Sequence, residues 1–172
     1  IVLKHKNIRE KMTYAEELEY LATNEKRNDF IVNLLQHLDG NTLCLFQLVE
    51  KHGKPLYDQV QETITDRKTF FVYGGTDTSE REEIRGTVEN EKKSIILASY
   101  GTFSTGKSRI RLLQSLGRGL RKTNTKFSVL IFDIADDISH NNTRNFTLNH
   151  FSERISLYNE QQFDYQISKV KL

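Results

Sequence analysis

The sequence predicts an α/β fold of three layers with a mainly parallel sheet. Short apolar runs alternate along the chain with segments of helical periodicity, which is the pattern of strands joined by crossover helices. The chain has 172 residues, of which 37% are hydrophobic, and this is enough for one domain with a core of its own and a small extension. Turn and helix-stop residues stand between the runs, so that the elements can be placed in order.

Two helices are predicted before the first strand. Thr13 and Glu16 form the pattern of a capping box, which places the start of a helix at this point. A second helical pattern, with apolar residues on one face, runs to about Leu38, and Gly40 follows it as a left-handed terminator.

Apolar runs bounded by turn residues mark the strands. They are Thr42–Gln47, Thr69–Tyr73, Ser94–Ser99 and Phe127–Ile134. Pro55 suits the first turn of the helix after the first strand, and Asp77 or Thr78 suits the cap of the helix after the second. At the C-terminal end, 151–160 predicts a helix and 163–170 alternates like an edge strand.

Composition excludes several classes of protein. The 25 basic and 23 acidic residues nearly cancel, so total charge indicates no nucleic-acid partner. Cys44 is the single cysteine and lies in an apolar run, and the five histidines lack the paired spacing of a zinc site. No apolar stretch approaches the roughly 20 residues of a membrane span. We therefore expect a soluble, cytoplasmic protein with no membrane partner and no structural metal.

One stretch fits the phosphate-binding P-loop pattern. Gly101 to Ser108, "GTFSTGKS", follows a predicted strand and precedes a predicted helix. In that reading the backbone amides and Lys107 hold phosphates, Ser108 holds magnesium, and Asp133 supplies a second oxygen ligand.

The helix after this stretch favours a different site. Between Lys107 and Lys122 there are six basic residues and no acid. The segment contains Gln114, Gly117, Arg118 and Arg121 in the pattern Q-x-x-G-R-x-x-R. Two arginines three residues apart share one helical face, and their planar, permanently charged groups suit phosphate oxygens. Such a pair can act as arginine fingers, although a basic helix face is more often only solvated.

Several segments, in order, resemble superfamily 2 DNA helicases, and in particular the phage recombination helicases among them. "ILASYGTFSTG" is similar to motif V and "RIRLLQSLGRGLRK" to motif VI. Upstream, "VYGGTDTSEREEIR", "GNTLCLFQLVEKHGKPLYDQV" and "LEYLATNEKRNDFIVNL" resemble the corresponding segments, including motif IV. The resemblance covers nearly the whole chain.

The resemblance implies the second RecA-like domain of a two-domain motor. ATP and Mg2+ would be held mainly by an N-terminal RecA-like domain that lies outside this sequence. Gln114, Arg118 and Arg121 match catalytic motif VI positions facing ATP, and Gly106 and Gly117 lie in the same nucleotide-binding motifs. The DNA-binding positions implied by the family are Gly74, Gly75, Thr76, Ser99 and Thr102. For the first two of these, a tight turn that needs two glycines is an equally good explanation.

The expected organisation follows from this resemblance. Residues 1–148 would form the RecA-like domain, with leading helices over 1–39 and the sheet core with motifs IV to VI over 40–148, and 149–172 would be a C-terminal extension. The partners would be branched DNA, bound without regard to sequence, and the first motor domain. A phage-encoded protein would act in the host cytoplasm. The fragment by itself is expected to be inactive as an ATPase.

The chain departs from the family in one place. Family members have a further turn and an apolar strand between motifs V and VI, whereas Gly106 in this chain is followed directly by Lys107. We hypothesise that a strand of about five or six residues and its loops are absent at this point, a typical strand length. Two alternatives stay open: a non-catalytic nucleic-acid-binding module with a RecA-like fold, and a small P-loop NTPase that uses Gly101 to Ser108.

Overall fold

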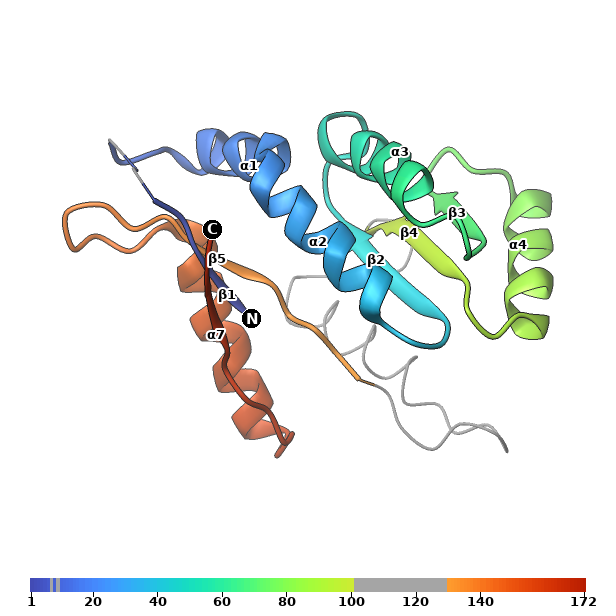
Figure 1. Ribbon diagram of the computed structural model, residues 1–172. Helices are drawn as coiled ribbons and strands as arrows, with labels where there is room; N and C mark the ends of the chain where they lie inside the picture. The colour runs from blue at the N-terminus through green and yellow to red at the C-terminus, as the bar shows by residue number, and fades with distance from the viewer. Residues whose placement is uncertain (7, 9, 101–129) are drawn as a thin grey trace. The chain divides into compact units, whose positions relative to one another are not determined.

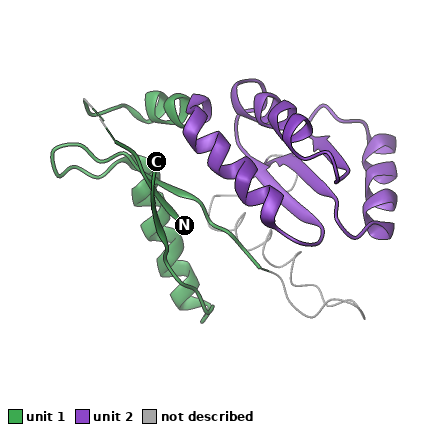
Figure 2. Cartoon of the chain, in the orientation of Figure 1, with its two compact units in different colours: residues 1–21, 106–172 green, residues 22–105 purple. Residues whose placement is uncertain are grey.

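The computed structural model describes residues 1–6, 8, 10–100 and 130–172 (Figure 1). The chain divides into two compact units, which are described separately (Figure 2). One unit comprises residues 22–105, and the other comprises residues 1–21 together with 106–172. Each has its own three-stranded sheet, and all strand pairs of the described residues are parallel. The predicted α/β class is confirmed, and this architecture is consistent with a RecA-like domain.

The unit of residues 22–105 is built on a sheet with strand order β2-β4-β3. Its strands are β2 (Thr42–Phe46), β3 (Thr69–Val72) and β4 (Ile95–Ser99). Its helices are α2 (Glu25–His37), α3 (Lys54–Thr63) and α4 (Thr78–Asn90), with a short π-helix, η1 (Val49–Gly53), before α3. The last of these strands in chain order, β4, is therefore the central one. Because both strand pairs are parallel, the carboxyl ends of the three strands lie at one edge of the sheet.

Local signals place these elements where the sequence predicts them. Asn24 caps α2 by accepting a hydrogen bond of 2.9 Å from the backbone amide of Arg27. Gly40 has a φ of +79°, the left-handed conformation expected after this helix. Pro55 lies in the first turn of α3. Asp77 is the N-cap residue of α4, as predicted, but its side chain makes no capping hydrogen bond.

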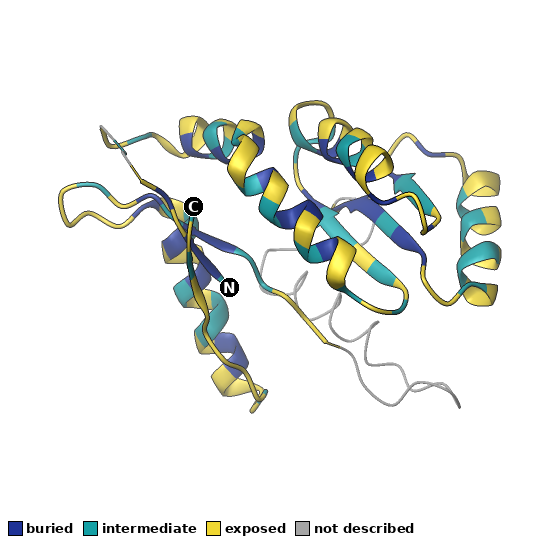
Figure 3. Cartoon of the chain, in the orientation of Figure 1, coloured by how far each residue is buried: buried dark blue, intermediate teal, exposed yellow. Residues whose placement is uncertain are grey.

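The core of this unit lies between the sheet and α2 and α3, as the buried positions in Figure 3 show. Ile95 and Leu97 of β4 are fully buried, as is Val60 of α3. Phe46 at the end of β2 stacks on Phe71 of β3, with 5.2 Å between the ring centroids. Burial of one such aromatic side chain stabilises the fold by roughly 1.5–3 kcal/mol.

Arg67 joins three elements of the same unit. Its guanidinium donates to the backbone carbonyls of Leu35 (2.7 Å), Leu38 (2.9 Å) and Gly40 (2.7 Å) at the end of α2. Its Nε donates to the carbonyl of Lys93, just before β4, at 2.9 Å. Burial lowers the pKa of this guanidinium, and the carbonyl oxygens around it take the place of water. A charged side chain therefore closes the C-terminal end of α2.

The second unit has a sheet with strand order β5-β1-β6. The strands are β1 (Val2–Lys4), β5 (Ala135–Asp137) and β6 (Lys169–Lys171). Helix α1 (Tyr14–Thr23) begins in this unit, and α7 (Phe146–Glu160) packs on β5. The capping box at the start of α1 is confirmed, since Thr13 donates to Glu16 through both its backbone amide and its hydroxyl at 2.7 Å.

A buried carboxylate orders this second unit. Glu17 of α1 is 1% exposed and accepts hydrogen bonds from the backbone amides of Phe146 and Thr147 in the first turn of α7, at 2.9 and 2.5 Å. It also accepts from Asn145 at 2.9 Å. The negative charge therefore lies at the positive end of the α7 dipole, where it is favourable.

Some predicted elements are shorter or displaced. The first three predicted strands are confirmed, and the predicted helix over 151–160 is the later part of α7. The strand predicted over 127–134 is wrong for its described part, because residues 130–134 are not a strand and β5 begins at Ala135. Leu130 is 76% exposed, so this part of the apolar run is not packed in a core. The C-terminal edge strand covers only Lys169–Lys171. The division at residue 148 stays a prediction.

Candidate nucleic-acid interface

Four of the predicted site residues belong to the described part of the chain: Gly74, Gly75, Thr76 and Ser99. The other predicted site residues lie outside the described residues. They are Thr102, Gly106, Gln114, Gly117, Arg118 and Arg121. The P-loop pattern from Gly101 to Ser108, with Lys107, is also outside them. The candidate interface is therefore built from the four described positions and their neighbours.

The four positions meet at the carboxyl edge of the β2-β4-β3 sheet. Ser99 is the last residue of β4 and pairs with Phe46 at the end of β2. The loop Tyr73–Thr76 follows directly after β3, whose Val72 pairs with Ala98 of β4. The carboxyl edge of a parallel sheet is the usual place for ligands in open α/β folds. The structure therefore brings together two of the motif regions that the sequence separates.

The loop after β3 is a closed turn. The backbone amide of Thr76 donates to the carbonyl of Tyr73 at 3.1 Å, and the amide of Tyr73 donates to the hydroxyl oxygen of Thr76 at 3.0 Å. Thr76 is 7% exposed, whereas Gly74 and Gly75 at the tip are exposed. The Thr76 hydroxyl thus closes the turn as an acceptor, and the exposed backbone of the loop belongs to the two glycines.

The turn does not itself require both glycines. Neither Gly74 nor Gly75 has a positive φ, since Gly40 is the one glycine of the described residues with that conformation. A Cβ on Gly74 would meet nothing within 4 Å. A Cβ on Gly75 would lie 2.7 Å from the ring of Tyr73. Backbone geometry therefore leaves the glycine at 74 unexplained, which favours a role in the close approach of a ligand.

Arg81 of α4 supports this loop and was not predicted from the sequence. Its Nη2 donates to the carbonyl oxygens of Tyr73 at 3.0 Å and Gly74 at 3.3 Å. Its Nε is buried and has no hydrogen-bond partner among the described residues. A positive charge thus lies directly against the exposed loop. One feature of the sequence could have indicated a special role for Arg81: it is a basic residue in the first turns of a helix, where acidic residues are preferred.

Ser99 differs from the two exposed glycines of the loop because it is buried, with 6% of its surface exposed. It ends the strand on the same face as Phe46 and Phe71, since alternate residues of a strand share a face. Its small side chain leaves room for these two rings to stack beside β4.

Asp133, the acid of the P-loop interpretation, is paired with side chains of α7. Asp133 accepts two hydrogen bonds from Arg154, at 2.7 and 2.8 Å, and one from the hydroxyl of Tyr158 at 2.8 Å. Its carboxylate is therefore occupied by an ion pair. Over the described ranges, no group of three or more His, Cys, Asp or Glu side chains is placed to hold a metal ion. Nor does this part of the chain contain a helix long and apolar enough to cross a membrane.

Comparison with known proteins gives one informative match. The chain is 33% identical over 188 residues to the ATP-dependent DNA helicase UvsW of Enterobacteria phage T4, and the match covers 93% of this chain. The chain spans 37% of the length of that relative. No family model matches, and no solved structure matches.

The lengths in this match are themselves informative. The aligned stretch of 188 residues is longer than the whole 172-residue chain. The match covers 93% of the 172 residues, about 160, so about 28 of the 188 aligned positions have no counterpart in this chain. The relative carries extra residues within the stretch that the two chains share.

Proposed function

Because this chain is related along 93% of its length to the ATP-dependent DNA helicase UvsW, we propose that it is the second motor domain of an ATP-dependent DNA helicase. The observation that carries the proposal is the 33% identity to that helicase. The position of Ser99 and the Gly74–Thr76 loop at one carboxyl edge of the sheet is consistent with it, since ligands bind there in open α/β folds.

In this proposal the basic helix acts on the nucleotide. Arg118 and Arg121 would reach the phosphates of ATP held by the first motor domain, and Gln114, Gly117 and Gly106 would line the same face of the cleft. ATP with Mg2+ would supply the chemical step. The contribution of this chain would be positive charge on the phosphate oxygens, which is how arginine fingers accelerate phosphoryl transfer.

The protein would bind DNA through the sugar-phosphate backbone of the DNA. The exposed amides of Gly74 and Gly75 are suited to phosphate oxygens, and Arg81 adds positive charge behind them. Thr76 and Ser99, which are buried, would support this surface from below, and Thr102 would complete it. Contacts of this kind carry no sequence information, so binding would be strongly salt-dependent and indifferent to sequence. Branched DNA as the substrate, acted on in the cytoplasm of the host cell, rests on the family resemblance.

The proposal includes the absence of a core strand after Gly106. The longer aligned stretch of the relative supports this, although it does not locate the extra residues. The outer edge of β2 also supports it. The backbone amide of Thr42 donates to the carbonyl of Ser94, and bonding residues alternate along a parallel strand. The backbone groups of Leu43 and Leu45 therefore point away from β4, and Leu43 is 46% exposed. Among the described residues this continuously apolar strand has no neighbour on that side, which is unusual for a parallel sheet.

The test uses the intact helicase that contains this chain. Arg118→Ala is expected to lower the ATPase rate by about 10³ to 10⁵, which is the usual effect of removing an arginine finger. DNA affinity in the absence of nucleotide should be unchanged. Arg85→Ala is the matched control, because Arg85 is exposed on α4 and its ion pairs within the described ranges are with Glu82 and Glu89 of the same helix. ATP hydrolysis by Arg118→Ala at the rate of the unsubstituted protein would contradict the role of Arg118 as an arginine finger.

The two alternatives predict different results. A non-catalytic binding module would show no nucleotide-dependent closure onto a first domain. A small P-loop NTPase would bind ATP as the isolated 172-residue chain and lose that binding in Lys107→Ala. The motor proposal expects no ATP turnover by the isolated chain.

A further inference from the structure

A second surface of the unit of residues 22–105 is the outer edge of β3. The amide of Ile95 donates to the carbonyl of Lys68 at 2.8 Å. This bond shows which residues along the strand point their backbone groups toward β4. In a parallel ladder the bonding residues alternate. Lys68, Phe70 and Val72 therefore direct their backbone groups toward β4, whereas Thr69, Phe71 and Tyr73 direct theirs outward.

Part of this outer row is already used. The amide and carbonyl of Tyr73 bond within the turn and to Arg81, and the carbonyl of Thr69 accepts from the hydroxyl of Tyr57 at 3.4 Å. The amide of Thr69 and the amide and carbonyl of Phe71 point outward and have no hydrogen-bond partner among the described residues. Such an edge is a template for one further strand.

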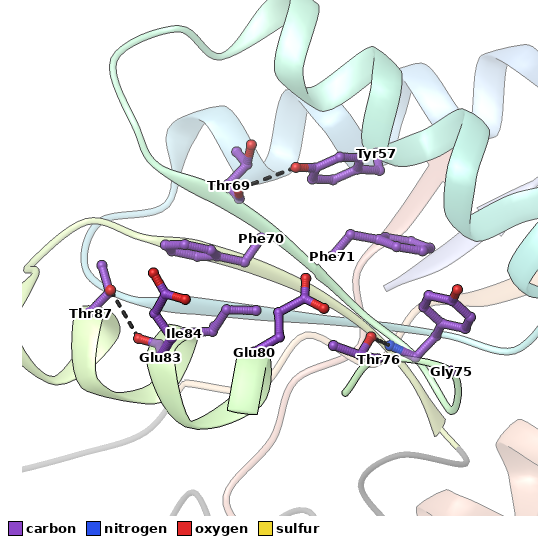
Figure 4. Close-up of a pocket in the computed structure, with 11 residues that line it drawn as sticks. Tyr57, Thr69, Phe70, Phe71, Gly75, Thr76, Glu80, Glu83, Ile84 and Thr87 are labelled. Atoms are coloured by element: carbon purple, nitrogen blue, oxygen red, sulfur yellow. Dashed lines mark hydrogen bonds between the residues drawn. The ribbon is translucent and has the colours of Figure 1, made fainter. Parts of the chain in front are cut away.

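A groove follows this edge, with a volume of about 510 Å³ (Figure 4). Phe70 and Phe71 line it from β3, Tyr57 from α3, and Ile84 from α4. The 13-residue helix α4 has no buried residue. It is held at its ends, where Asn41 donates to the carbonyls of Val88 and Glu91 and Arg81 binds the loop. The apolar surface between α4 and β3 is consequently not filled by the described residues.

The charge of the groove is negative. Glu80 and Glu83 of α4 line it, and both are exposed. Neither has an ion-pair partner in the described ranges, whereas Glu82 and Glu89, on the same helix, pair with Arg85. Tyr73, Gly75 and Thr76 of the loop line one end of the groove, and the two carboxylates of α4 would repel phosphates from the rest of it. A cationic occupant would be attracted.

We propose that the outer edge of β3, beneath α4, binds an extended basic segment of another protein as an additional strand. The backbone of the segment would pair with Thr69 and Phe71, its apolar side chains would contact Phe70 and Ile84, and its lysines or arginines would meet Glu80 and Glu83. This is strand addition to a sheet edge, in which the backbone gives affinity and alternate side chains give specificity. It is a protein-interaction site that goes beyond the motor function.

The test measures fluorescence anisotropy of a labelled peptide of alternating lysine and valine, titrated with the 172-residue chain. A peptide with glutamine in place of lysine serves as the neutral probe. The double variant Glu80→Gln/Glu83→Gln is expected to weaken binding of the lysine peptide about fivefold, the size expected for two exposed charge pairs. The matched double variant Glu82→Gln/Glu89→Gln removes the same charge from α4 outside the groove and should change affinity less than about twofold.

Strand pairing has a separate readout. Amide hydrogen exchange at Thr69 and Phe71 should slow when the peptide binds. Thr69→Pro removes an outward amide at the first position of β3, where proline is tolerated, and should abolish binding without loss of the fold. Equal binding by both double variants, or unchanged exchange at Phe71, would overturn the proposal. Slow exchange without peptide, together with a dimer in sedimentation, would overturn it in favour of a second copy of this chain.

Discussion

The guanidinium of Arg81 donates a hydrogen bond of 3.0 Å to the backbone carbonyl of Tyr73, eight residues earlier in the chain. The bond runs from α4 to the loop that ends β3, and a second bond reaches Gly74 at 3.3 Å. A helix with no buried residue is thereby tied to the loop that we propose as a DNA contact. Arg81 therefore both holds the shape of that loop and supplies the positive charge beside it.

Arg81→Met is expected to lower the free energy of unfolding by about 1–2 kcal/mol, because hydrogen bonds from a charged donor to two carbonyls are lost. DNA affinity of the intact helicase should fall as well. Urea unfolding and DNA titration measure the two effects. Arg85→Met is the control, since its ion pairs are exposed and it should change stability by less than about 0.5 kcal/mol. Equal effects of both substitutions would show that the loop contacts of Arg81 contribute nothing.

Gly74→Ala and Gly75→Ala are expected to separate structure from binding. Gly74 has an ordinary φ and open space, so alanine should leave stability unchanged or raise it by about 0.4–1 kcal/mol. Its methyl group would stand where a phosphate approaches, so DNA affinity should fall. Gly75→Ala should lower stability, because the ring of Tyr73 must move. Thermal unfolding and DNA titration test both. Unchanged DNA affinity in Gly74→Ala would argue against a phosphate contact at this loop.

Arg67→Met is expected to be the most destabilising of these substitutions, by roughly 3 kcal/mol, because several buried carbonyls lose their donor together. Arg67→Lys should recover only part of the loss, since an ammonium cannot reproduce the planar fork of donors. The measurement is the urea midpoint of each variant. A Lys variant as stable as the native chain would contradict the role assigned to the fork.

The capping box predicts a dependence of stability on pH. The hydrogen bonds from the backbone amide and then the hydroxyl of Thr13 lower the pKa of Glu16 below its ordinary value of 4.5. A lowered pKa in the folded state stabilises the protein above pH 4.5, and this contribution is lost as the pH falls through the folded value. The stability difference between the native chain and Glu16→Ala should therefore be present at about pH 7 and shrink below pH 4.5. Urea unfolding over this range measures it, and a constant difference would refute the assignment.

Much of the local structure could be predicted from the sequence. Strands β2, β3 and β4 were predicted from continuous apolar runs ended by turn residues, and α1 from its capping box. The candidate loop was predicted from the resemblance to the helicase family, which implies DNA contacts at Gly74, Gly75 and Thr76. Arg81 was not, because an arginine among the acids of α4 has the pattern of an exposed helix face. Its role depends on a carbonyl that folding brings within reach.

The sequence by itself determined the α/β class, the positions of most helices and strands, and the relationship to a DNA helicase, since these are written in local patterns and in the order of motifs. The tertiary structure alone decided which strand is central, where charge is buried and which edge strand keeps unpaired backbone groups among the described residues. β1 is a three-residue strand with no signal of its own, and it becomes central by pairing with strands near the other end of the chain. Arg67 is buried because carbonyls from α2 and from the start of β4 surround it. These properties arise from contacts between distant segments, which a local pattern does not contain.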